Sequence, residues 1–450
     1  MLGRAGDPEA RASVFRLAWP VMVSNLLQTL TTTIDLLLVG SLGATAPRAV
    51  AAVGLGGQFL FLFFSIMISV SAGTIALVAR AIGAKDQSTA DHVLKQSLLL
   101  GALLSVPLTV FGILFARPVL LSFGAEPAVV DLGTAYIQIV SLSVFFQFIA
   151  FLGNSALRGA GDTVTPLWIG GLVNVVNFLL AVNLIYGLVL VPRLEVAGAA
   201  IATSLSYVVG AAAVLGVLLR GRGRLRLRLS GDWLDREMIR RIFRIGWPAT
   251  LEQIMLQLAF ILWVGMVVGF GTEILAAHQI GLRIQSFAFM PGFGFAIAAT
   301  ALVGQNLGAR NPAAAERSGW EAAKLSVLVM VGIAVAIFAF APTIARAFIA
   351  DDVVVGWTVT FIRIHAVSIP AVGVFFAIDG ALRGAGDTRF PLKTSLSGIY
   401  AVRLPLSFIL GFILNFGIIG VWIPLVVEYW YRAAVISLHF RRGRWKSLRV

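Results

Sequence analysis

The sequence lacks cysteine altogether and carries little charge. None of its 450 residues is Cys, and Asp, Glu, Lys and Arg together make up only 12%, whereas soluble domains carry about 25%. The absence of cysteine excludes disulfide bonds and metal sites built on thiolates. The shortage of charge excludes an ordinary soluble domain, because too few charged side chains remain for its surface.

Common catalytic and nucleotide-binding motifs are also missing. The sequence contains no GxxxxGK[ST] phosphate loop, no HExxH or GxSxG motif and no cluster of histidines. Direct coupling to ATP would therefore have no binding site in this chain. We expect neither an enzyme nor a bound cofactor.

What the sequence does have is long hydrophobic segments. Hydrophobic residues make up 59% of the chain, and the mean hydropathy is +0.93. A membrane-spanning helix needs about 20 mostly apolar residues, and such segments recur along the whole chain. They lie near residues 14–40, 52–82, 93–116, 130–157, 164–190, 194–219, 241–269, 272–305, 318–345, 357–381, 391–415 and 418–440. The pattern predicts an all-α polytopic membrane protein with twelve transmembrane helices.

Basic residues are distributed unevenly between the expected loops. If the N-terminus is cytoplasmic, 27 of the 35 Lys and Arg residues fall on that side. The positive-inside rule then places both termini in the cytoplasm. The arginine-rich segment 220–240 is expected to be a basic cytoplasmic linker near anionic headgroups. Its first part, RGRGRLRLRL at 220–229, has no interleaved aromatics, so the net charge of +14 does not indicate nucleic-acid binding. No cleavable signal peptide precedes the first span.

The two halves of the chain repeat one another. The octapeptide ALRGAGDT occurs at 156–163 and again at 381–388, FRLAWP at 15–20 returns as FRIGWP at 243–248, and ARAIGAKD at 79–86 corresponds to GQNLGARN at 304–311. Such a repeat predicts two six-helix lobes, 1–219 and 241–450, joined by the linker 220–240. Because each half has an even number of spans, the lobes should be related by a pseudo-twofold axis along the membrane normal.

The octapeptides lie between spans 4 and 5 and between spans 10 and 11. Their Gly-Ala-Gly sequence suits a tight turn, and Asp162 and Asp387, or the threonines after them, can cap the next helix. We interpret both copies as structural corners, so that the chemistry is expected elsewhere.

Acidic residues inside spans carry that chemistry, since a charge at a helix centre costs about 2.5–3.5 kcal/mol on insertion scales. Asp35 shares one helix face with Ser24, Gln28, Thr31 and Thr32. This polar stripe predicts a wet cavity beside the first span, with Asp35 as a cation-coupling residue.

Two further carboxylates lie in the second half. Glu252 occupies the place of Ser24 in the repeat, and Asp379 occupies the place of Asn154, so the halves do not share their acidic positions. We expect Glu252 and Asp379 to couple cations, as a proton site or a sodium site. The alternative is a structural ion pair with Arg283 or Arg403.

Weaker candidates complete the set. Asn177 could supply an oxygen ligand, and Asn154, Phe375 and Arg283 could contribute to substrate or cation binding. His278 and His365 are isolated and are expected in the core. Glu428 is expected to pair with Arg432.

The chain resembles the multidrug and toxic compound extrusion (MATE) family. The resemblance rests on two six-helix halves, the paired LRGAGDT corners, the Trp-Pro openings of spans 1 and 7, and AAHQIGLRI at 276–284. It implies a V-shaped two-lobed exporter driven by protons or sodium, with amphipathic and mostly cationic substrates.

The resemblance also assigns individual residues. Asp35 matches the family's span 1 aspartate, while Glu252 and Asp379 match the carboxylates of the NorM-like branch, where a cation site has been placed. Two positions depart from the family's pattern. Ala181 stands where an acid or amide often follows Asn177, and Phe375 stands where a tyrosine is usual.

These observations predict a multi-pass antiporter in the inner or plasma membrane of a bacterium or archaeon. Its partners would be amphipathic small molecules and the lipid bilayer, without nucleic acid, and the chain would act as a monomer. The alternative is a flippase or exporter of lipid-linked or other amphipathic metabolites on the same scaffold.

Overall fold

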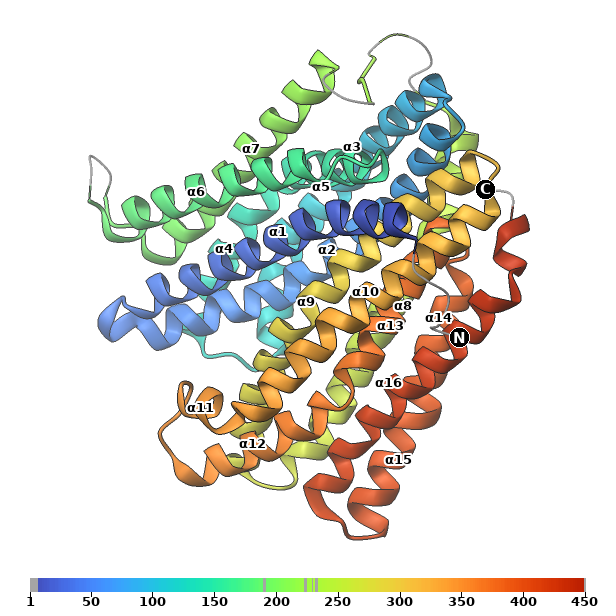
Figure 1. Ribbon diagram of the computed structural model, residues 1–450. Coiled ribbons are helices and arrows are strands. Elements are labelled where there is room, and N and C mark those ends of the chain that lie inside the picture. The colour runs from blue at the N-terminus through green and yellow to red at the C-terminus, as the bar shows by residue number, and fades with distance from the viewer. Residues whose placement is uncertain (1–6, 189–191, 222–224, 229, 231–233, 449–450) are drawn as a thin grey trace. The chain divides into compact units, whose positions relative to one another are not determined.

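The computed structural model describes residues 7–188, 192–221, 225–228, 230 and 234–448, and this part of the chain is helical without strands. The first half forms α1 (Pro8–Gly40), α2 (Ala46–Gly83), α3 (Gln87–Ser122), α4 (Pro127–Leu142), α5 (Val144–Gly159), α6 (Val164–Tyr186) and α7 (Glu195–Arg220), with the short turn η1 (Gly43–Thr45) (Figure 1).

The second half forms α8 (Arg236–Val268), α9 (Thr272–Gly308), α10 (Pro312–Ala339), α11 (Ala341–Arg346), α12 (Asp352–Ala366), α13 (Ile369–Gly384), α14 (Arg389–Leu396), η2 (Ser397–Arg403), α15 (Leu404–Phe408), η3 (Ile409–Ile413), α16 (Gly417–Arg442) and η4 (Arg444–Ser447). The segments η2 and η3 are π-helical, and they make the eleventh span irregular.

The expected membrane-spanning architecture is confirmed. Ten helices of the described chain are long and apolar enough to cross a membrane, and two bent helix pairs bring the number to as many as twelve. The bent pairs are α4 with α5, at 53°, and α12 with α13, at 48°. The sequence analysis did not predict these bends.

The two bends fall at equivalent positions of the repeat and have the same local cause. Ser143 and Ser368 stand 225 residues apart, and each hydroxyl donates to the carbonyl three residues earlier, on Val140 and on His365, at 2.7 Å. Such side-chain bonding to the preceding turn bends helices. The bends therefore belong to the duplicated scaffold.

By packing, the chain divides into two compact units. Unit 1 comprises residues 1–22 and 247–450, and unit 2 comprises residues 23–246. The boundaries lie inside α1 and α8, close to the repeated Trp-Pro pairs. The predicted lobes, 1–219 and 241–450, differ from these units at the two helix starts. The first turns of α1 pack in unit 1 with the second half of the chain, and the first turns of α8 pack in unit 2 with the first half.

The first turns of α1 belong to unit 1 because their apolar side chains are buried there. Val14, Leu17 and Ala18 form one core cluster with Phe295 and Ala298 of α9. In a membrane protein, van der Waals packing of this kind holds helices together.

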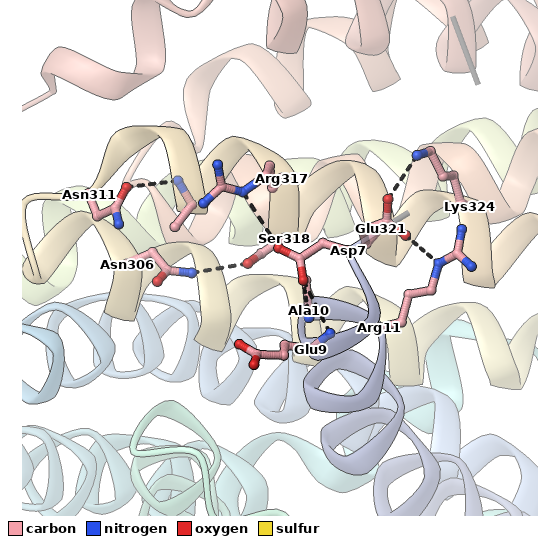
Figure 2. Close-up of polar contacts among 11 residues, drawn as sticks. Asp7, Glu9, Ala10, Arg11, Asn306, Asn311, Arg317, Ser318, Glu321 and Lys324 are labelled. Carbon is pink, nitrogen blue, oxygen red and sulfur yellow. Dashed lines mark hydrogen bonds and ion pairs between the residues drawn. The ribbon is translucent and has the colours of Figure 1, made fainter. Parts of the chain in front are cut away.

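Polar contacts hold the start of α1 in the same unit. Figure 2 shows Asp7 capping the amides of Glu9 and Ala10 while its carboxylate faces Arg317 of α10, at 3.7 Å. Arg11 donates to Glu321 at 2.8 Å, and Lys324 donates to the other oxygen of that carboxylate. The helix start is thereby fixed at both its backbone and its side chains.

Unit 2 holds the start of α8 in a related way. His92 and Asp235 lie 2.9 Å apart, and Asp235 caps the amides of Glu237 and Met238. The repeat equates Asp235 with Asp7 and His92 with Arg317. The same two positions therefore anchor a helix start in each unit.

The described part of the predicted linker packs on α3. The Arg226 amide donates to buried Asp91 at 2.8 Å, and Lys95 donates to the Ser230 carbonyl at 3.0 Å. Linker residues 222–224, 229 and 231–233 lie outside the described residues, as do residues 1–6 and 449–450.

The octapeptides form the expected corners. Gly161 and Gly386 have φ angles of +87° and +84°, which a side chain would strain. Asp162 accepts the Thr165 amide at 2.9 Å and Asp387 accepts the Phe390 amide at 3.2 Å. The predicted helix caps are therefore confirmed at the aspartates.

Close backbone contact between α13 and α9 generates a first prediction. A Cβ at Gly380 would lie 2.2 Å from the Ala296 carbonyl oxygen. We expect Gly380→Ala to destabilise the protein by about 1–3 kcal/mol, because the helices must move apart. Thermal unfolding of purified protein, followed by intrinsic fluorescence, measures the change. Gly356→Ala is the control, since nothing lies within 4 Å of its new Cβ; equal melting of the two variants would contradict the prediction.

Candidate functional site

The two predicted carboxylates of the second half lie together in unit 1, bridged by one arginine. Arg383 Nη2 donates to Glu252 Oε2 at 2.6 Å, and Arg383 Nε donates to Asp379 Oδ2 at 2.7 Å. Glu252 is 5% exposed and Asp379 is 8% exposed. The site is therefore a buried carboxylate pair that already holds a positive charge.

The identity of the bridging arginine corrects the sequence analysis. The structural partner considered there was Arg283 or Arg403, and both assignments were wrong, because neither makes an ion pair with Glu252 or Asp379. Arg383 belongs to the second octapeptide, which was interpreted as a corner without chemistry. The spacing carried a signal, since Asp379 and Arg383 are four residues apart on one helix face.

A hydrogen-bonded network continues from this pair. Ser395 of α14 donates to Glu252 Oε1, and Arg432 of α16 donates to Ser395 Oγ at 2.6 Å. Arg432 also donates to Glu428 at 3.0 Å, and Arg403 of η2 donates to the other oxygen of Glu428 at 2.6 Å. The predicted pairing of Glu428 with Arg432 is confirmed.

The network balances its charges but leaves one acceptor free. It contains three arginines and three carboxylates, so it is neutral when all are ionised. Asp379 Oδ1 is buried and has no hydrogen-bond partner within the described part of the chain. A buried carboxylate oxygen without a donor is costly. This oxygen is the one place in the network prepared to accept a proton or another donor.

The predicted sodium site at Glu252 and Asp379 is not preformed. Arg383 lies between the two carboxylates, so a metal ion shared by them would have to displace its guanidinium. Among the described residues, no three His, Cys, Asp or Glu side chains converge as metal ligands. A proton at Asp379 Oδ1 requires no such displacement.

A cavity of about 320 Å³ adjoins the network in unit 1. Arg403 lines it and also belongs to the network. Trp263, Phe289 and Tyr429 supply aromatic walls, and Arg283 lies at the same cavity. Arg283 was a weaker candidate for substrate or cation binding, and it lies at this cavity, apart from the two carboxylates.

Phe375, another weaker candidate for substrate or cation binding, packs against an arginine of the network. Its side chain is 3% exposed, and the Arg432 guanidinium lies 3.8 Å from its ring centroid. This cation–π contact stabilises the arginine in a desolvated place. Phe375 therefore supports a network arginine and does not line the cavity.

The third predicted carboxylate, Asp35, lies in unit 2 beside Asn177. With its amide nitrogen toward the carboxylate, Asn177 donates to Asp35 Oδ1 at 2.9 Å and Oδ2 at 3.3 Å, and its oxygen faces the Thr203 hydroxyl. Tyr136 of α4 and Tyr207 of α7 lie within electrostatic range of Asp35. Asn177 is 4% exposed, so its contact with Asp35 is buried in the packing of unit 2.

The predicted polar stripe does not converge on Asp35. The hydroxyls of Thr31 and Thr32 donate to carbonyls four residues earlier in α1, each at 3.0 Å, and the side chains of Gln28 and Thr32 are exposed. These two threonines therefore satisfy the helix's own backbone, and the partner of Asp35 comes from another helix.

Unit 2 has no counterpart of the carboxylate pair. The repeat places Asn154 at the position of Asp379 and Arg158 at the position of Arg383. Asn154 Oδ1 and Arg158 Nε are both buried without a hydrogen-bond partner among the described residues. One octapeptide arginine thus binds two carboxylates, while its equivalent pairs with no carboxylate of the described chain.

Comparison with known proteins identifies the family. The family model described as MatE matches residues 20–183 and 248–409. The chain belongs to the MatE family. This MatE protein is similar to a "Probable multidrug resistance protein NorM" of Thermotoga maritima, at 30% identity over 98% of the chain and 95% of the relative.

Further similarities extend over the whole chain. A protein of the same description from Bradyrhizobium diazoefficiens is 32% identical over 95% of the chain and 92% of the relative. A solved structure described as the "Outward-facing conformation of a multidrug resistance MATE family transporter of the MOP superfamily" gives a TM-score of 0.91 at 26% identity, covering 98% and 97% of the two chains.

These findings confirm the resemblance to MATE transporters and the helical fold that it implied. The MatE protein is a multi-pass membrane transporter rather than an enzyme, and its relatives are named for multidrug resistance. Multidrug efflux is the activity that they support.

The bridging role of Arg383 generates a second prediction. Arg383→Gln leaves Glu252 and Asp379 buried without their cation, and breaking such a pair costs about 3–5 kcal/mol. We expect a lower melting temperature at neutral pH. The deficit should shrink as the pH falls, because protonation neutralises the carboxylates that lost their partner. Thermal unfolding between acid and neutral pH measures both effects.

Arg158→Gln is the matched control, since it alters the same octapeptide position without removing an ion pair. Adding Glu252→Gln and Asp379→Asn to Arg383→Gln should restore part of the lost stability. An Arg383→Gln variant that melts like the Arg158→Gln variant would refute the bridging role.

Proposed function

We propose that this transporter is a secondary active antiporter that exports amphipathic compounds in exchange for protons. The main support for this proposal is the Glu252–Arg383–Asp379 cluster, in which one buried carboxylate oxygen is free to accept a proton. Asp35 with Asn177 in unit 2 is a second coupling group of the same proposal.

Protons are favoured over sodium by the position of Arg383. Its guanidinium occupies the space between the carboxylates, whereas a proton needs only Asp379 Oδ1. After protonation, Arg383 would keep a full ion pair with Glu252 alone. Five ionised groups would then remain in the network, three arginines and two carboxylates, with one excess positive charge.

That excess charge offers a link to the substrate. Arg403 ends the network at the cavity wall, so a change in the charge at Asp379 alters the potential that a ligand in the cavity experiences. Proton binding then drives export only to the extent that it stabilises one facing state over the other. The groups involved lie on α8, α13, α14, η2 and α16.

We propose that the protein lies in the inner or plasma membrane with both termini in the cytoplasm. We further propose that it works as a monomer. The uneven distribution of Lys and Arg supports this orientation. The lipid-linked alternative is less well supported, because about 320 Å³ is at the lower limit of small-molecule pockets.

Efflux of ethidium, a fluorescent amphipathic cation, from proteoliposomes tests the coupling. We expect efflux under an imposed pH gradient and none under a sodium gradient at equal pH. Asp379→Asn should abolish gradient-driven efflux, because the free oxygen becomes an amide that cannot be protonated. Asp35→Asn separates the contribution of unit 2.

Asp352→Asn is the control variant, because this carboxylate is exposed and pairs only loosely with Arg346, at 3.5 Å. Efflux at the normal rate by the double variant Asp35→Asn and Asp379→Asn would overturn the proposal. Efflux driven by sodium alone would overturn the choice of ion and retain the antiporter.

A further inference from the structure

The side chains that line the cavity of unit 1 indicate which class of ligand it can bind. Its wall combines the aromatic rings of Trp263, Phe289 and Tyr429 with the polar groups of Gln279 and Arg283. Phe289 and Tyr429 pack edge to face, with ring centroids 5.6 Å apart. The aromatic part of the wall is thus a fixed surface against which a flat ring can pack.

The charge on this wall is positive. Arg403 is compensated by Glu428 at 2.6 Å, behind the cavity. Arg283 has no carboxylate within ion-pair distance in the described part of the chain, and no Asp or Glu is among the lining residues. One uncompensated guanidinium therefore remains at the cavity. Arg283 is also exposed, so a ligand can reach it.

The spacing of the polar groups suits an oxyanion. Gln279 and Arg283 are four residues apart on α9 and so lie on one helix face. A guanidinium binds a carboxylate through two parallel hydrogen bonds, and a side-chain amide can donate a third. A cationic group would instead face Arg283 without any acid to balance it.

We propose that this cavity binds an amphipathic compound that combines an aromatic ring with a carboxylate or a similar oxyanion. The ring packs against Trp263, Phe289 and Tyr429, and Arg283 holds the anionic group with help from Gln279. The inference deepens the proposed export function and rests on it only for the direction of transport.

Equilibrium binding to the full chain in lipid nanodiscs tests the ligand class. Three probes share one ring system and differ in charge: 2-naphthoate, 2-naphthylmethylammonium and neutral 2-naphthylmethanol. We expect naphthoate to bind most tightly. Arg283→Gln should weaken naphthoate by about tenfold or more, the size expected for a charge-assisted hydrogen bond, and should leave the neutral probe within about twofold.

Matched variants make the result specific. Arg363→Gln removes another exposed arginine of unit 1, which lies over Phe338 and outside the cavity, and should leave naphthoate binding unchanged. Arg283→Lys keeps the charge but not the paired hydrogen bonds, and should give an intermediate affinity. This variant also guards against misfolding of Arg283→Gln.

Each outcome decides the inference. Preference for the ammonium probe, or equal naphthoate binding by the parent and Arg283→Gln proteins, would overturn it. Binding needs no ion gradient, so failure of coupled efflux with intact naphthoate binding removes the proposed antiport and keeps this site. Coupled efflux without naphthoate binding keeps the proposed antiport and removes this binding site.

Discussion

Charges buried among apolar helices must neutralise one another, and in unit 1 this requirement fixes how four helices meet. The ionised side chains come from α8, α13, η2 and α16, and each carboxylate finds a guanidinium within 3.0 Å. Pairing of this kind is weak evidence for stability, but removing one partner leaves an uncompensated buried charge. Among the described residues, Asp379 Oδ1 is the one carboxylate oxygen of the network without a hydrogen-bond partner.

The duplication shows how one scaffold can carry two kinds of site. The bends at Ser143 and Ser368 and the glycine corners recur because backbone geometry imposes the same need in both halves. The charged groups do not recur. Trp263 stands at the position of Asp35, is 1% exposed and donates to the Val421 carbonyl at 3.1 Å. The repeat position that holds the Asp35 carboxylate in unit 2 thus holds an aromatic residue of the cavity wall, Trp263, in unit 1.

This asymmetry matters for a transporter of chemically varied compounds. Unit 2 offers a carboxylate with an amide partner, and unit 1 offers an aromatic cavity with an uncompensated arginine. The network that ends at Arg403 connects the free oxygen of Asp379 to the cavity wall through ion pairs and hydrogen bonds.

The sequence by itself determined the helical membrane fold, the twelve spans, the corners and the three acidic residues, because hydrophobic length, repeat spacing and the cost of a buried charge are local properties of the chain. Glu428 and Arg432 could be paired for the same reason, since four residues bring them together on one helix. Tertiary structure alone decided that Arg383 bridges Glu252 and Asp379, that Asn177 and not the threonine stripe meets Asp35, and that Arg283 faces a cavity. These contacts join residues up to 142 positions apart, as for Asp35 and Asn177, and only the packing of whole helices brings such groups within hydrogen-bond distance.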